Sequence, residues 1–198
     1  MVAQESQQAA KAADTADDVT LWICVSANTK WPGDPVIAHL SRQFGEVAVN
    51  PPATHAYGVL RHADGDMYAI EAVPHAGVHL FDPIEKDGQI VRWYRVPGTQ
   101  VQVQDVWDEG RYHLGRKYDF FGLLMTFVFL VAGRPARIYL RRPRLFCSAL
   151  WAFALRWNGL DLWPGVHIDT IYPALLEAKM LEAGWYDHRS SRRRVPRD

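Results

Sequence analysis

Short apolar runs of strand length dominate residues 21 to 96. They are rich in β-branched and aromatic side chains and are separated by polar or Gly- and Pro-containing turns, the pattern typical of β-strands. One helix interrupts them, with a start signal at Pro32, Gly33 and Asp34 ahead of Val36 and Ile37. The predicted strands cover Leu21–Val25, Thr54–Leu60, Met67–Val73, Gly77–Phe81 and Ile90–Val96.

After Pro97 the apolar segments take the length and spacing of helices. A helix is predicted over Val101–Leu114, ended by Gly115, and a second over Tyr118–Ala132, capped by Asp119. Two more are predicted over Cys147–Trp157 and residues 172–183. Strands followed by helices indicate an α+β fold, in which an antiparallel sheet of about five strands packs against helices.

One domain with two polar ends is the predicted organisation. The chain has 198 residues, of which 48% are hydrophobic and 12% aromatic, which suits a single domain and excludes a mainly disordered chain. We expect a polar arm over residues 1–20, the domain over 21–186 and a basic tail over 187–198. The two cysteines, Cys24 and Cys147, are too few for a disulfide framework.

Charge is balanced in total but uneven along the chain. Residues 1–133 carry 16 acidic and 10 basic side chains and residues 134–198 carry 6 and 12, so a segment of −6 precedes one of +6. The zero total excludes a generally basic protein that coats nucleic acid. The asymmetry indicates a surface interaction near the C-terminal third.

Two segments bear on membranes and export. The first 20 residues contain four acids, one Lys and no apolar core, so we expect no signal peptide and synthesis in the cytoplasm. Phe120–Ala132 is the most apolar run; a helix of 13 residues rises about 20 Å, short of a hydrocarbon core of roughly 30 Å, which favours a buried helix over membrane contact. The arginines that follow suit a membrane surface as well as a solvated connector. They are Arg134, Arg137, Arg141, Arg142 and Arg144.

Cys147 is a candidate nucleophile because it stands at the predicted start of a helix. Backbone N–H groups and the positive end of the helix dipole favour a thiolate there, and the arginines upstream act in the same direction. A free cysteine is also often a small buried apolar residue. Cys24, inside an apolar strand, is predicted to be of that second kind.

His55 and Glu71 are candidates for the base and the group that orients it. If the chain turns around Ala63, the two positions lie opposite each other on one face of a hairpin. A carboxylate beside an imidazole fixes its tautomer and stabilises its protonated form. Alternatively, Glu71 is an outward position on a half-exposed strand, and the alternation of side chains permits both interpretations.

A metal or cofactor is not predicted. His75 and His79 would share a face only in a helix, against which Gly77 argues, and no carboxylate-rich pattern accompanies them. We therefore expect neither a metal site nor a bound cofactor.

Four segments in order resemble a known family: THAYGVL, YAIEAV, GRKYDFFG and FCSALWAFAL, within about residues 21–160. They look like the circularly permuted branch of the NlpC-type (YiiX-like, papain-related) cell-wall cysteine peptidases. The resemblance implies a papain-like fold whose sheet precedes the Cys-bearing helix. By matching position it implies Cys147 as nucleophile, His55 as base and Glu71 as orienting partner, with Tyr118 and Ser148 in oxyanion and substrate binding.

The chain departs from the family pattern at two positions. Thr54 and Ala149 stand where Ser and Glu are frequent in the family, so no specific subfamily is implied. Neither position is one of the proposed catalytic groups.

Hydrolysis of amide bonds in the peptide stems of peptidoglycan, through a thiol acyl-enzyme, is the activity that the resemblance implies. One alternative is a lipid acyltransferase or thioesterase of the same thiol class at a membrane surface, which the apolar segment and its arginines favour. Another is an inactive binding or structural module. A wall hydrolase lacking an export signal requires delivery to the periplasm by a virion, a lysis system or a secretion machine.

Overall fold

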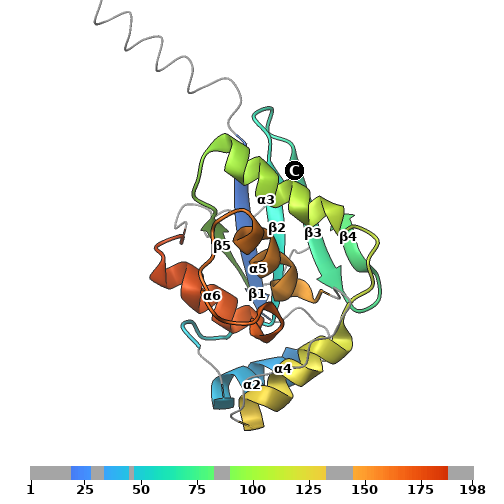
Figure 1. The fold of residues 1–198 in the computed structure, drawn as a ribbon, viewed down its shortest axis with the longest axis vertical. Coiled ribbons are helices and arrows are strands. Elements are labelled where there is room, and N and C mark those ends of the chain that lie inside the picture. The colour runs from blue at the N-terminus through green and yellow to red at the C-terminus, as the bar shows by residue number, and fades with distance from the viewer. Residues whose placement is uncertain (1–18, 28–33, 45–46, 83–89, 133–144, 187–198) are drawn as a thin grey trace, which may run out of the picture.

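The computed structural model describes residues 19–27, 34–44, 47–82, 90–132 and 145–186, which form an α+β fold (Figure 1). The predicted α+β class and the antiparallel five-stranded sheet are confirmed, and five α-helices accompany the sheet in these residues. The connector over 133–144, the tail over 187–198, and the arm up to residue 18 lie outside the described residues. The strands are β1 (Thr20–Ala27), β2 (His55–Arg61), β3 (Met67–Val73), β4 (Gly77–Phe81) and β5 (Ile90–Arg95). The helices are α2 (Asp34–Phe44), α3 (Gln100–Tyr112), α4 (Phe120–Ala132), α5 (Cys147–Trp157), the 3-10 helix η2 (Ile168–Thr170) and α6 (Pro173–Glu182).

Alternation of side chains along the strands gives the sheet two different faces. The strands run in the order β4-β3-β2-β1-β5, and one face lies under α3, α5 and α6, which cross the same side of the sheet in Figure 1. That face contributes most of the core, including Leu21, Ile23, Val25, Ala56, Leu60, Ile70 and Ala72. The opposite face holds a smaller cluster of Cys24, Tyr57, Val59 and Ala69, covered in part by Trp22, Phe81 and Trp93. Cys24 is fully buried there, as predicted for a core cysteine.

Helix α5 is fixed against β2 by one tryptophan and two glycines. Trp151 is fully buried, and a Cβ atom built on Gly58 of β2 would lie 2.2 Å from its indole ring. On the α3 side, a Cβ atom on Gly110 would lie 3.0 Å from the same ring, and Trp107 stacks on it with ring centroids 6.3 Å apart. Because Gly58 and Gly110 have no side chain, the Trp151 ring fits between β2 and α3, and α5 can approach the sheet closely.

Helix α4 is exposed along one side, which corrects the prediction of a buried helix. Gly122, Leu123 and Thr126 face inward, near α2 and η2, and Asp119 caps the helix by accepting the N–H of Gly122 at 2.8 Å. The outward residues are Phe120, Phe121, Leu124, Val128 and Val131, each about half exposed. The apolar run has no polar face that could have marked its solvent side. No helix in the described residues is long and apolar enough to span a membrane.

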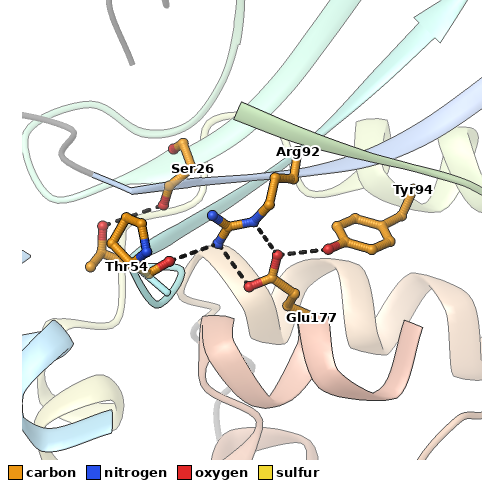
Figure 2. A network of polar contacts seen from close by, with 6 residues as sticks. Ser26, Thr54, Arg92, Tyr94 and Glu177 are labelled. Carbon is orange, nitrogen blue, oxygen red and sulfur yellow. Dashed lines mark hydrogen bonds and ion pairs between the residues drawn. The ribbon is translucent and has the colours of Figure 1, made fainter. Parts of the chain in front are cut away.

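A buried ion pair joins β5 to α6 (Figure 2). The guanidinium of Arg92 donates from both Nε and Nη2 to the carboxylate of Glu177, and Tyr94 donates its hydroxyl to Glu177 Oε1 at 2.6 Å. Nη2 of Arg92 also donates to the carbonyl of Pro51 at 3.1 Å. Arg92 is 7% and Glu177 1% exposed, so each charge depends on the other. The guanidinium of Arg92 thereby connects α6 and the segment that leads into β2 to strand β5.

Glu177→Gln is expected to lower the free energy of unfolding by about 3 kcal/mol, because it leaves the buried Arg92 charge without a counter-ion. Chemical denaturation followed by circular dichroism measures the change. The matched control is Glu182→Gln in the same helix, whose partner Lys179 is 2.9 Å away and whose own side chain is 62% exposed. That control is expected to cost a few tenths of a kcal/mol. Equal losses in the two variants would contradict a buried-charge role for Glu177.

Candidate active site

Cys147 is the first residue of α5. It is 2% exposed, and Phe146, which precedes it in extended conformation, has an apolar side chain that cannot cap the helix. The first N–H groups of a helix have no acceptor within the helix and carry its positive dipole end. One of them, the N–H of Ser148, donates to the sulfur of Cys147. The helix start therefore offers hydrogen bonds that favour a thiolate.

The sulfur of Cys147 also lies against the beginning of β2. The ladder between β2 and β3 ends at the pair Tyr57–Glu71, although β3 continues to Val73 against β4. The N–H of Ala56 lies just beyond this last pair and donates to the Cys147 sulfur. The start of β2 and the start of α5 thus both supply a backbone N–H to the Cys147 sulfur.

His55 connects the sulfur to Glu71. Its ring is hydrogen-bonded to Cys147 on one side, and its Nε2 donates to Oε2 of Glu71 at 2.7 Å on the other. Because Nε2 is engaged by Glu71, Nδ1 is the ring nitrogen left for Cys147. The structure brings together Cys147, His55 and Glu71, which are distant in sequence and come from α5, β2 and β3.

The predicted hairpin register is wrong by two residues. Glu71 pairs with Tyr57 rather than His55, because the turn centres beyond Ala63, with Gly65 at a φ of +99° and a hydrogen bond from His62 N–H to the Asp66 carbonyl. A shift of two positions keeps a side chain on the same face. Glu71 consequently reaches His55 along the diagonal, and at 5% exposed it is not the outward position of the alternative interpretation.

The three groups change one another's protonation. Burial raises the pKa of Cys147, but the hydrogen bond to His55, the charge of its ring and the N–H groups of Ala56 and Ser148 lower it further than burial raises it. Burial lowers the pKa of His55, whereas hydrogen bonds to Cys147 and Glu71 and their negative charges raise it, with a net value of about 9. This arrangement stabilises a thiolate and an imidazolium together.

Tyr118 and Ser148, assigned to oxyanion and substrate binding by the resemblance, lie at different kinds of position. The backbone of Tyr118 pairs with Leu145, two residues before Cys147, and its half-buried ring packs against the main core. The buried hydroxyl of Ser148 donates to the carbonyl of Ile171 at 2.6 Å, so this residue offers the sulfur its backbone N–H and not its side chain.

Two polar residues near the triad were not assigned to the site from sequence. His79 stands directly opposite Glu71 on β4, with its Nε2 3.5 Å from Glu71 Oε1. Ser26 pairs with His55 across β1 and β2; its hydroxyl is fully buried and has no hydrogen-bond partner among the described residues. A register of the β3–β4 hairpin centred on His75 would have placed His79 against Glu71.

No group of three or more His, Cys, Asp or Glu side chains arranged to hold a metal ion occurs in the described residues.

Comparison of the chain with protein-family models, curated proteins and solved structures finds no match. A thiol, a base hydrogen-bonded to it and a carboxylate behind the base form the arrangement that activates a cysteine nucleophile.

The thiolate of Cys147 is expected to form below the ordinary thiol pKa of 9.0, and its pair with the imidazolium of His55 should persist up to the pH at which His55 loses its proton, about 9. The ultraviolet absorbance of the thiolate, taken as wild type minus Cys147→Ser, measures this titration. His55→Gln should move the thiolate step to higher pH, because burial then acts without the cation that opposes it.

Cys24→Ala is the control, since burial raises the pKa of Cys24 and this thiol should contribute no step below pH 9. A wild-type titration at the ordinary thiol value would refute an activated Cys147.

Proposed function

We propose that the protein is a cysteine hydrolase that cleaves amide bonds through an acyl-enzyme on Cys147. The observation that carries this proposal is the buried chain of contacts from the Cys147 sulfur through His55 to Glu71 at the start of α5. A papain-like fold with a circularly permuted order is part of the same proposal. It is consistent with a sheet that precedes the Cys-bearing helix.

The first half-reaction forms a thioester. The thiolate of Cys147 attacks the amide carbonyl carbon, and the S–C bond forms while the carbonyl oxygen becomes an oxyanion. The N–H of Cys147, at the first turn of α5, and the Tyr118 hydroxyl are the proposed oxyanion donors. As the C–N bond breaks, the imidazolium of His55 gives its proton to the leaving amine.

The second half-reaction restores the thiolate. The neutral imidazole of His55 takes a proton from water, whose oxygen attacks the thioester carbonyl. The C–S bond breaks, the acyl group leaves as a carboxylic acid and His55 is again an imidazolium beside a thiolate. Glu71 holds the ring in the tautomer that both steps need and stabilises its charge.

The substrate class rests on the resemblance to the cell-wall peptidases, which implies the peptide stems of peptidoglycan. Delivery to the periplasm by a virion, a lysis system or a secretion machine belongs to this proposal. A substrate within the cell would need no such partner.

Cys147→Ala is expected to reduce the release of amines from purified peptidoglycan by at least about a thousandfold, because the covalent step is lost. The matched control is Cys24→Ala, which alters the other cysteine, on the far face of the sheet, and should retain wild-type hydrolysis. Free amino groups and separated muropeptides are the readouts. Hydrolysis that is unchanged in Cys147→Ala would overturn the assignment of the nucleophile.

The exposed face of α4 favours a second candidate function, a lipid acyltransferase or thioesterase at a membrane surface. Phe120, Leu124 and Val128 lie at four-residue spacing on one side of the helix and are each about half exposed. Such a face can enter the headgroup region of a bilayer without spanning it. The arginines of segment 134–144, in sequence next to α4, carry the charge that anionic lipids attract, and they lie outside the described residues.

Under this second candidate, the protein should float with vesicles that contain phosphatidylglycerol. Leu124→Gln combined with Val128→Gln should weaken that binding at least about tenfold, since each change removes apolar area from the interface. Val101→Gln on α3 is the matched control, because Val101 is 69% exposed and lies away from α4. The absence of wild-type flotation would remove the support for a membrane-surface function.

A further inference from the structure

Glu71 lies between two imidazole rings. Its Oε2 accepts a hydrogen bond from His55 at 2.7 Å, and its Oε1 is 3.5 Å from Nε2 of His79 on the neighbouring strand. The carboxylate is 6% exposed at its side chain, whereas His79 is 31% exposed. Each oxygen of the buried carboxylate therefore has its own imidazole, one toward the thiol and one toward the surface.

Strand geometry aims the ring of His79 at Glu71. The two residues are a direct cross-strand pair between β3 and β4, the arrangement with the shortest distance between side chains on one face of a sheet. Nδ1 of His79 lies 3.3 Å from the carbonyl of Gly77, so the ring is held on both nitrogens. The contact with the Gly77 carbonyl thus orients the ring, and its other edge faces the Glu71 carboxylate.

The cluster buries a net negative charge, which polar contacts around Glu71 have to stabilise. A thiolate on Cys147, an imidazolium on His55 and a carboxylate on Glu71 sum to one buried negative charge. Tyr57, the other titratable side chain that faces Glu71 from β2, is held neutral, because burial and the nearby negative charges raise its pKa well above the ordinary value. Polar contacts to Glu71, such as the one from the His79 ring at 3.5 Å, therefore offset part of the cost of burying the site.

We infer that His79 is a positioning residue of the candidate site: its ring, 3.5 Å from Oε1, restrains the Glu71 carboxylate so that Oε2 stays on the ring of His55. This inference rests on the proposed function of Cys147, His55 and Glu71. His79 contacts neither the sulfur nor a substrate in this role and acts through Glu71. Its loss lets the carboxylate rotate, and the imidazolium of His55 is then less well stabilised.

The test compares variants of His79 that remove or keep a polar group near Oε1 of Glu71. His79→Val and His79→Thr suit a strand and cannot reach Glu71, whereas His79→Gln places an amide N–H near the same oxygen. His75→Val is the matched control, because His75 is an exposed histidine in the turn between the same two strands. Two loss variants are used so that poor folding of one, detected by thermal unfolding, leaves the other as a readout.

Two measurements are made on each variant. The first is the pKa of His55, followed by NMR of its ring protons, which needs no substrate. In Val and Thr it should fall by about one unit from its wild-type value of about 9, and Gln should restore most of it. The second is kcat and KM on a soluble peptidoglycan stem peptide. We expect kcat to fall about tenfold with KM unchanged in the loss variants, because a polar contact to a buried charge is lost.

The outcomes separate the inference from the function on which it rests. An unchanged His55 pKa and kcat in Val and Thr would overturn the role of His79, and so would a Gln variant as impaired as Val. If wild type does not cleave the peptide but the loss variants still lower the His55 pKa, the positioning role stands and the proposed function fails. If wild type cleaves and only the His79 effects are missing, the function stands alone.

Discussion

A charged sulfur atom without water around it is the constraint on which the rest of the candidate site depends. Cys147 is nearly inaccessible, and an ion in that position needs donors and an opposite charge from the protein itself. They come from three separate elements: the N–H of Ser148 on α5, the N–H of Ala56 on β2, and the ring of His55, backed by Glu71 on β3. All three must hold their positions together, which ties the chemistry to the packing of one helix on one sheet.

The two buried ionic groups are connected through the segment that leads into β2. Arg92 and Glu177 occupy the face under the helices, and the same guanidinium binds the carbonyl of Pro51. From there the chain runs to Thr54, whose hydroxyl donates to the Ser26 carbonyl at 3.4 Å (Figure 2). The N–H of Thr54 donates to the same carbonyl at 2.9 Å, and His55 is the next residue. The ion pair thus anchors the segment that leads directly to His55 at the start of β2.

Most of the fold follows from local signals in the sequence, and the exceptions follow from contacts between distant segments. Strand and helix positions could be predicted because apolar runs, turns and caps such as Asp119 act within a few residues. The exposed side of α4 could not, since an almost uniformly apolar run does not mark which side meets solvent. Arg92 and Glu177 are 85 positions apart, and no short pattern links them.

The candidate site shows the same division. Cys147 could be singled out by its place at a helix start, and His55 and Glu71 by their place on neighbouring strands. Their pairing was predicted two residues out of register, and the period of two along a strand kept the carboxylate on the correct face despite that error. His79 required the register of a second hairpin as well, so its partner became visible only in three dimensions.

The early end of the β2–β3 ladder has a consequence for how the sheet could vary. A ladder extended by one more pair would engage the N–H of Ala56 in a strand-to-strand bond and take it away from the sulfur. An unpaired residue at the end of a strand ordinarily weakens a sheet. Here the residue beyond the last β2–β3 pair supplies an N–H group that stabilises the thiolate. A longer β2–β3 hairpin would therefore stabilise the sheet and at the same time remove one hydrogen-bond donor from the Cys147 thiolate.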